Sequence, residues 1–395
     1  MKTIHKALLI LILLTATSCA KKEEIIYTEK PKEVTIETVE TVDVYSEINL
    51  FDLITINNAT ISSENKKINT STIGIKTIEI FYKVNNLKYI YKFNINIVDT
   101  VAPIVLSGTS KTVELNHEKD LCNLIMFGDN YDKKARCTIT GDYDLSKTGT
   151  YYLKYIIKDQ SNNETEFSIT LTVIPKSSNN IETPKTLTPF SEIYNNHKTE
   201  NTEIGLDLSK WQETVDYEEI KKAGVTFVML RIGVQKSVPG ELEMDTYYLE
   251  NIKKAKEAGL KVGVYLYSIA TSKEESITHA KWVIEKLDGT KLDMPIVFDW
   301  ESWNWWNELN LSFYEINDIA DSFLKTVEES GYDAMLYSSK YYLENIWENK
   351  LDYPVWLAHY TKQTNYTGKY VMWQLTDSAK IPGVKNAVDV NVLYK

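Results

Sequence analysis

The stretch Pro295-Ile296-Val297-Phe298-Asp299-Trp300-Glu301 places an apolar run directly before two carboxylates. The apolar run is typical of a buried strand, and residues two apart on a strand point to the same side. Asp299 and Glu301 are therefore expected to face the same space. Two carboxylates held close together cannot both ionise without cost, so the pKa of one of them should rise. A carboxylic acid whose pKa is raised, and which lies beside an ionised carboxylate, is suited to general acid catalysis.

The chain around this stretch alternates strands with helices. From Glu203 onward, short apolar runs recur, and helix-capping signals lie between them. Asp245 is expected to cap a helix that runs through Ala258, and Ser312 with Glu315 forms a capping box for a later helix. Eight apolar strands, with helices expected to be missing from the last connections, predict an irregular β/α (TIM-like) barrel over residues 203–395.

Acidic and aromatic residues collect where the predicted strands end. In a β/α barrel the catalytic groups lie at the C-terminal ends of the strands. Asp207, Asp299, Glu301 and Asp389 are the candidate catalytic acids. Aromatic faces can stack on sugar rings, although packing under the barrel rim is the alternative for any single tryptophan. The candidates for substrate contact at the same mouth are Trp211, Tyr265, Trp303, Tyr337, Trp356, Tyr360 and Gln374.

The sequence before the barrel has a β pattern in two consecutive segments, residues 32–99 and 100–175. Polar and apolar residues alternate in both, and the two segments look like copies of one module. Gly74 and Gly149 precede long strands at an offset of 75, and Phe93 and Phe167 follow at an offset of 74. Short strands with turn signals predict two β-sandwich modules, so the whole chain is expected to be multidomain.

The second module carries four loose motifs. They are Asp99-Thr100-Val101-Ala102-Pro103, Asp129-Asn130-Tyr131-Asp132, Thr148-Gly149-Thr150-Tyr151 and Lys158-Asp159-Gln160-Ser161-Asn162-Asn163. On these motifs the module resembles the bacterial immunoglobulin-like (Ig-like) repeats of surface proteins. The resemblance implies a spacer or a wall contact. The aspartates are expected to be solvated turn residues, with a bound metal as the alternative.

The N-terminal residues predict an export signal. Residues 1–19 combine a basic start, an apolar run too short to span a bilayer, and small residues before Cys19. The small residues resemble the lipobox of bacterial lipoproteins, which implies acylation of Cys19 and anchoring in the membrane. The alternative is an ordinary secretory signal. Both place the mature chain outside the cytoplasm, with residues 20–31 as a tether and residues 176–202 as a linker.

The remaining cysteines, Cys122 and Cys137, form a pair in an oxidising compartment. A disulfide between them would close a short loop and stabilise the fold by about 3 kcal/mol. Two buried free thiols are the alternative. The net charge of −11 argues against nucleic acid as a partner. It does not oppose a carbohydrate.

Several barrel motifs resemble the family 25 glycoside hydrolases, and they occur in that family's order. They are Ile204-Gly205-Leu206-Asp207-Leu208-Ser209-Lys210-Trp211-Gln212, Phe227-Val228-Met229-Leu230-Arg231-Ile232-Gly233, Val262-Gly263-Val264-Tyr265, Pro295 to Glu301, Val355-Trp356-Leu357-Ala358-His359-Tyr360, Met372-Trp373-Gln374 and Val388-Asp389-Val390-Asn391. The resemblance covers residues 203–395. One departure is Leu266, where the family often has histidine.

This resemblance implies a lysozyme that cuts the β-1,4 bond between N-acetylmuramic acid and N-acetylglucosamine in the glycan strand of peptidoglycan. It implies Glu301 as proton donor, Asp299 as the group that orients or stabilises the substrate, and Asp207 and Asp389 as supporting acids. It implies no metal or organic cofactor, and we expect a monomer. The alternatives are an inactive wall-binding barrel and a surface adhesin that uses the Ig-like modules.

Overall fold

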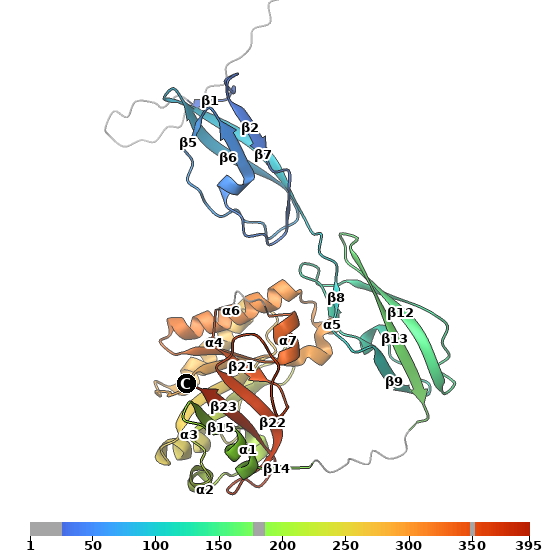
Figure 1. The fold of residues 1–395 in the computed structure, drawn as a ribbon, viewed down its shortest axis with the longest axis vertical. Coiled ribbons are helices and arrows are strands. Elements are labelled where there is room, and N and C mark those ends of the chain that lie inside the picture. The colour runs from blue at the N-terminus through green and yellow to red at the C-terminus, as the bar shows by residue number, and fades with distance from the viewer. Residues whose placement is uncertain (1–25, 177–185, 348–351) are drawn as a thin grey trace, which may run out of the picture. The chain divides into compact units, whose positions relative to one another are not determined.

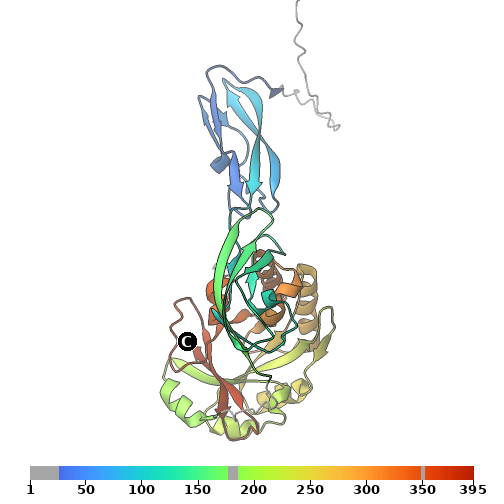
Figure 2. The ribbon, with the colours of Figure 1, turned by 90° about the vertical axis from the view of Figure 1, so that its right-hand side faces the viewer.

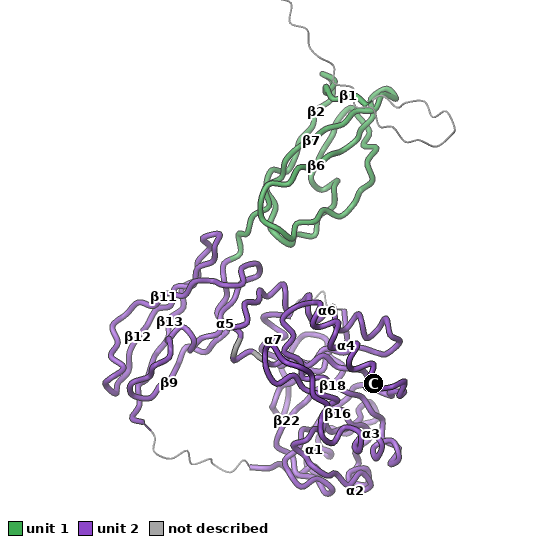
Figure 3. The backbone as a smooth tube through the Cα atoms, turned by 180° about the vertical axis from the view of Figure 1, so that it is seen from behind, with its two compact units in different colours: residues 1–101 green, residues 102–395 purple. Residues whose placement is uncertain are grey.

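The computed structural model of the chain describes residues 26–176, 186–347 and 352–395. It divides into two compact units, residues 1–101 and residues 102–395 (Figure 3). The predicted signal peptide with Cys19 lies outside the described residues, as do residues 20–25 of the predicted tether, whereas Ile26 and Tyr27 of the tether form a short strand. Within the described ranges, no helix is long and apolar enough to cross a membrane.

Unit 1 is built from strands. One sheet has the order β1 (Ile26–Tyr27), β7 (Leu87–Val98), β6 (Gly74–Val84) and β5 (Thr60–Ile61), and β3 (Thr41–Asp43) also pairs with β7. A second sheet pairs β2 (Thr35–Thr38) with β4 (Ile54–Asn57), next to the short helix η1 (Leu50–Leu53). Alternate residues of β6 are buried, which gives the unit its core.

Unit 2 begins with a second β module. A four-stranded sheet has the order β11 (Arg136–Thr140), β12 (Gly149–Lys158), β13 (Glu164–Ile174) and β9 (Ser110–Glu114). A two-stranded sheet pairs β8 (Ile104–Val105) with β10 (Phe127–Gly128), and η2 (Leu121–Leu124) lies between them in sequence. A disulfide joins Cys122 to Cys137, with their Cα atoms 6.2 Å apart.

The two β modules share one topology. The long hairpin β6–β7 begins at Gly74, and the long hairpin β12–β13 begins at Gly149 (blue to cyan and green in Figures 1 and 2). In each module a short strand that precedes the hairpin in sequence pairs in parallel with the second hairpin strand. These pairs are β3 with β7 and β9 with β13. The offset between the predicted copies therefore corresponds to equivalent strands. Membership of either module in an Ig-like family stays a prediction.

The rest of unit 2 is a closed barrel of eight strands. They are β15 (Thr202–Leu208), β16 (Phe227–Gln235), β18 (Lys261–Tyr267), β19 (Ile296–Asp299), β20 (Ala334–Ser339), β21 (Val355–Ala358), β22 (Met372–Lys380) and β23 (Val388–Tyr394). The first seven run parallel in this order. The last strand pairs antiparallel with both β15 and β22 and closes the ring. The short strand β17 (Leu242–Met244) pairs antiparallel with the end of β16.

Helices cover the first connections of the barrel. They are α2 (Tyr217–Lys222), α3 (Tyr248–Glu257), α4 (Lys273–Leu287), the pair η4 (Ser302–Trp305) and α5 (Trp306–Leu309), α6 (Phe313–Glu329) and α7 (Lys340–Asn345), with η3 (Lys210–Gln212) after β15. Ser312 and Glu315 form the predicted capping box of α6. The described residues between β21 and β23 contain no helix, in keeping with the expected irregular barrel.

The expected role of Asp245 as a helix cap is wrong. Helix α3 begins at Tyr248, and its N-cap is Tyr247. Oδ2 of Asp245 accepts hydrogen bonds from the Arg231 guanidinium, at 2.8 Å from Nε and 2.6 Å from a terminal nitrogen, while Oδ1 accepts the backbone N–H of Tyr247 at 3.0 Å. Arg231 is buried, and a buried charge without a partner is costly, so its pairing with Asp245 is strongly favoured.

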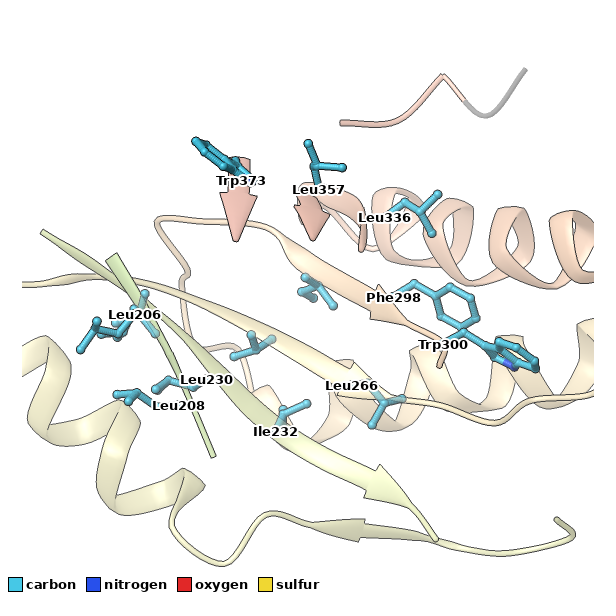
Figure 4. Packing of buried hydrophobic residues seen from close by; sticks show 14 of the residues in the cluster. Leu206, Leu208, Leu230, Ile232, Leu266, Phe298, Trp300, Leu336, Leu357 and Trp373 are labelled. Atoms are coloured by element: carbon cyan, nitrogen blue, oxygen red, sulfur yellow. The ribbon is translucent and has the colours of Figure 1, made fainter. Parts of the chain in front are cut away.

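Alternate strand residues divide into an outer and an inner core. The outward residues pack beneath the helices, as Leu206, Leu230, Leu266, Phe298 and Leu336 do in Figure 4. The inward residues fill the barrel interior and include Phe227, Met229, Val297, Met335, Trp356 and Met372. Every strand is therefore buried on both faces, and polar side chains in the interior need a specific explanation.

Part of the predicted linker is structured. Residues 188–189 form β14 (Thr188–Pro189) against β22, and α1 (Phe190–His197) follows directly. Phe190 and Ile193 are buried in the outer core of the barrel. They are three residues apart and so lie on one face of the helix. The barrel therefore begins at about residue 188 rather than at residue 203.

The β module of unit 2 contacts the loop that follows β19. The Asn307 amide donates to the carbonyl of Ile125 at 2.9 Å and accepts from the backbone of Phe127 at 3.4 Å. The backbone N–H of Phe313 donates to the carbonyl of Asp129 at 2.8 Å. These contacts attach the module to the segment that carries Glu301 and the start of α6.

Replacing Gly205 with alanine should destabilise the barrel. An added Cβ would lie 2.4 Å from the Phe227 ring, and that ring is fully buried. We expect a loss of about 1–3 kcal/mol in the free energy of unfolding. All nine tryptophans lie between residues 211 and 373, so tryptophan fluorescence during urea unfolding reports on the barrel.

The matched control is Gly108→Ala, whose added Cβ meets no atom within 4 Å. This variant should leave the fluorescence transition where it is. An unchanged midpoint for Gly205→Ala would contradict the packing described for the inner core.

Candidate active site

Asp207 lies in the interior of the barrel near the end of β15 and is held by two amides. Its Oδ2 accepts hydrogen bonds from Asn391 Nδ2 at 2.8 Å and from Gln374 Nε2 at 3.0 Å. Burial raises the pKa of Asp207 to about 6, and the two amide hydrogen bonds limit the rise. Asp207 is therefore ionised at neutral pH.

Asp299 ends β19 and points into the same interior space. Burial, and then the charges of Glu301 and Asp207, raise the pKa of Asp299 well above its usual range, while Arg231 opposes the shift. No hydrogen bond from the described residues reaches its buried Oδ1. The sequence predicts a raised pKa for one of the two acids, whereas burial raises the pKa of both Asp299 and Glu301.

Glu301 follows the strand at the open mouth, where the residue is exposed to solvent. Protein atoms nevertheless crowd its carboxyl group and raise the pKa of Glu301. A hydrogen bond with Tyr337 lowers this pKa, and the charge of Asp207 raises it again. A carboxylic acid that is reachable and retains its proton towards neutral pH is suited to donate that proton.

Gln374 connects Asp207 to two tyrosines. Its Oε1 accepts hydrogen bonds from the hydroxyls of Tyr337 at 2.8 Å and Tyr360 at 3.1 Å, while its Nε2 donates to Asp207. All the polar atoms of the amide are thus used, which fixes its orientation. Gln374 therefore positions both tyrosines beside the carboxylates.

Asp389 and Tyr265 complete the acidic interior. Asp389 lies directly across from Asp207 in the β15–β23 pairing. Burial raises the pKa of Tyr265 well above its usual range, and the charges of Asp207, Asp299 and Asp389 add to that rise. All four predicted acids therefore surround one end of the barrel interior.

The predicted tryptophan contacts separate into exposed and buried groups. Trp211 is 66% exposed at the rim, where the Lys210 ammonium lies 4.8 Å from its ring centroid. Trp356 is 2% exposed, and its Nε1 donates to Asn391 Oδ1 at 2.8 Å. Trp303 is 7% exposed and stacks on Tyr342, with ring centroids 4.0 Å apart. Only Trp211 of these three is exposed enough to meet a substrate.

The interior contains two polar residues that were not among the candidate site residues. Asn391 is fully buried and bridges Trp356 to Asp207. Arg231 is buried, pairs with Asp245, and lowers the pKa of Asp299. A signal for both was available, because each is a polar residue that alternates with apolar residues along its strand.

A separate acidic cluster lies in the β module of unit 2. Asp129, Asp132 and Asp159 are buried, and carboxylate oxygens of the three lie within 4.8 Å of one another. Backbone N–H groups donate to each of them, for example Gln160 to Asp132 at 2.6 Å. Such a set of oxygens could hold a hard divalent cation. The expectation that these aspartates are solvated is wrong.

Asp207→Asn should stabilise the barrel at pH 7. Because the pKa of Asp207 rises from 3.8 to about 6 on folding, the folded protein binds more protons between these values. Stability therefore falls as the pH rises through this window. Asparagine can accept both amide hydrogen bonds without charge, so we expect a gain of at most about 3 kcal/mol at pH 7.

The gain should vanish below about pH 4, where the unfolded chain is protonated as well. Urea unfolding followed by tryptophan fluorescence at both pH values tests this. The same substitution at exposed Asp142 should change stability by less than about 0.5 kcal/mol. A gain that persists at pH 4 would show that removal of charge is not its cause.

Comparison with known proteins is consistent with this geometry. The family model of glycosyl hydrolases family 25 matches residues 206–384. The uncharacterized protein YegX of Escherichia coli K12 is 30% identical over 192 residues, which are 48% of this chain and 68% of that protein. An autolytic lysozyme of Clostridium acetobutylicum is 27% identical over 189 residues, which are 47% of this chain and 54% of that protein.

Solved structures of this kind also align with the chain. The spore cortex lytic enzyme SleM of Clostridium perfringens is 24% identical, covering 50% of this chain and 68% of SleM, with a TM-score of 0.42. A family 25 glycosyl hydrolase from Bacillus anthracis is 20% identical, covering 50% of this chain and 92% of that one, with a TM-score of 0.43. From the family match and the YegX relative, we conclude that the chain belongs to glycosyl hydrolase family 25 and is a glycoside hydrolase.

Proposed function

We propose that the chain is a peptidoglycan hydrolase that cuts the β-1,4 bond between N-acetylmuramic acid and N-acetylglucosamine. The observation that carries this proposal is Glu301, a reachable carboxyl group with a raised pKa beside the ionised Asp207. The relative named as an autolytic lysozyme supports a cell-wall glycan as substrate.

In this proposal the Glu301 proton passes to the glycosidic oxygen as the bond to the sugar carbon breaks. Positive charge then develops at that carbon, and the ionised Asp207 stabilises it. Water completes the hydrolysis: its hydroxyl group bonds to this carbon, and its remaining proton restores the carboxylic acid of Glu301. Asp299, whose raised pKa favours its protonated form, orients the acetamido group through a hydrogen bond. Asp389 faces Asp207 across the strands and supports the negative potential of the site.

Peptidoglycan lies outside the cytoplasmic membrane, so the proposed activity is extracytoplasmic. Acylation of Cys19 would hold the enzyme at the membrane surface facing the wall. This part of the proposal rests on the N-terminal sequence alone.

Glu301→Gln should abolish most turnover and leave the fold intact. Glutamine keeps the size of the side chain and cannot donate the proton, so kcat should fall by at least about 100-fold. Loss of turbidity of purified cell walls measures the rate. Mass analysis of the muropeptides, which identifies the reducing-end sugar, separates a muramidase from a glucosaminidase.

The matched control is Glu308→Gln, an exposed glutamate on the nearby helix α5, which should keep wild-type turnover. Wild-type turnover in Glu301→Gln would remove Glu301 from the role of proton donor. Wild-type protein that pellets with walls without cutting them would favour the inactive wall-binding alternative.

Tyr337→Phe should move the alkaline limb of the pH profile to higher pH. Activity requires protonated Glu301 and falls as the pH rises through its pKa. The Tyr337 hydroxyl has one proton, which it donates to Gln374 or turns to the ionised Glu301 carboxylate. The hydrogen bond to Glu301 lowers the pKa of Glu301, so removal of the hydroxyl raises it. The control is Tyr332→Phe, whose hydroxyl donates to Thr290 instead. A limb that moves to lower pH in Tyr337→Phe would contradict this assignment.

A further inference from the structure

A cavity of about 540 Å³ lies beside the mouth of the barrel. Helix α1 forms one wall with Glu192, Ile193 and His197. The segment after β21 and the strand β22 form the other walls, where Lys362 and Asp377 also line the cavity. All of these residues belong to the barrel part of unit 2.

Tyr360 joins this cavity to the active site. The residue is 53% exposed and lines the cavity, while its hydroxyl donates to Gln374 next to Asp207. The charges of Asp389, Asp207 and Glu301 all act on its phenol group. A ligand in the cavity would therefore be separated from the proposed site of bond cleavage by the Tyr360 side chain.

The wall formed by α1 is a feature outside the family match. That match begins at residue 206, whereas α1 spans Phe190–His197. Phe190 and Ile193 fix the helix in the outer core, so its polar face is held in place over the cavity. The cavity thus depends on a segment that precedes the catalytic motifs.

The cavity is lined by negatively charged, positively charged and apolar side chains. Glu192 and Asp377 supply carboxylates, Lys362 supplies an ammonium group, and Ile193 and Leu375 are apolar. The lining also offers hydroxyl groups and the ring of Tyr360, which suit a sugar, but a neutral sugar would offer no charge to the three charged groups. A short peptide with carboxylates, an ammonium group and methyl side chains matches all three features of this lining.

We propose that this cavity binds the peptide stem attached to the muramic acid of the strand being cut. The proposal rests on the proposed muramidase function, because only that substrate carries a peptide next to the cleaved bond. The cavity then makes the enzyme prefer glycan that still bears its peptides over bare glycan.

Two single variants test this proposal in the full chain, Glu192→Gln and Lys362→Met. Both residues are exposed, so the fold should persist, as circular dichroism can verify. The substrates are intact peptidoglycan and glycan strands freed of peptide by an amidase. On intact peptidoglycan we expect KM to rise about 3- to 10-fold with kcat unchanged, the scale of one lost polar contact. On peptide-free strands both constants should match those of the wild type.

The matched controls are Glu200→Gln and Lys369→Met, exposed residues outside the cavity lining that should leave both substrates unaffected. An equal rise in KM on both substrates would show a sugar site and overturn the proposal. Unchanged KM on both substrates would overturn it too, while the muramidase function would stand. Wild-type protein that cuts neither substrate would contradict the muramidase function and this assignment together.

Discussion

The site depends on the alternation of inward and outward side chains along the strands of a closed ring. In each strand the outward residues are apolar and packed under helices, so the inward residues share a confined interior. Asp207, Asp299, Tyr337, Gln374 and Asn391 all occupy inward positions near one end. Closure of the ring by the antiparallel strand β23 brings Asp389 and Asn391 against β15. Without that closure the carboxylates would have no common space.

Confinement makes the carboxyl groups compete for negative charge. Asp207 accepts two amide hydrogen bonds, whereas no described residue donates to Asp299 Oδ1. The negative charge therefore resides most favourably on Asp207 at neutral pH, and its presence raises the pKa of both Asp299 and Glu301. Arg231 partly offsets the field at Asp299, and its own charge is held by Asp245. The two amide donors keep Asp207 ionised, and the charge of Asp207 in turn helps Glu301 to keep the proton that it would transfer.

Much of this arrangement could be predicted from sequence because apolar strands and the acids at their ends are local patterns. The inward direction of Asp299 follows from its position after Val297 on one strand. The burial of Trp303 could not be predicted in this way, because it depends on Tyr342, a residue far along the chain that stacks on its ring. The ion pair of Arg231 was missed for the same reason. Its partner Asp245 has the local pattern of a helix cap and does accept the backbone N–H of Tyr247, but its other carboxylate oxygen pairs with Arg231 on a different element.

Helix α1 shows how an element can be hidden within a polar segment. Its surroundings are rich in polar residues and proline, and only Phe190 and Ile193 mark an apolar face. An isolated helix of eight residues is unstable in water, so this one exists because the barrel supplies the surface that buries those two side chains. Its polar face, including Glu192, is then fixed beside Tyr360 at the mouth. A segment that is only marginally helical by itself thereby becomes a fixed wall of the cavity beside the candidate active site, where precise placement matters most.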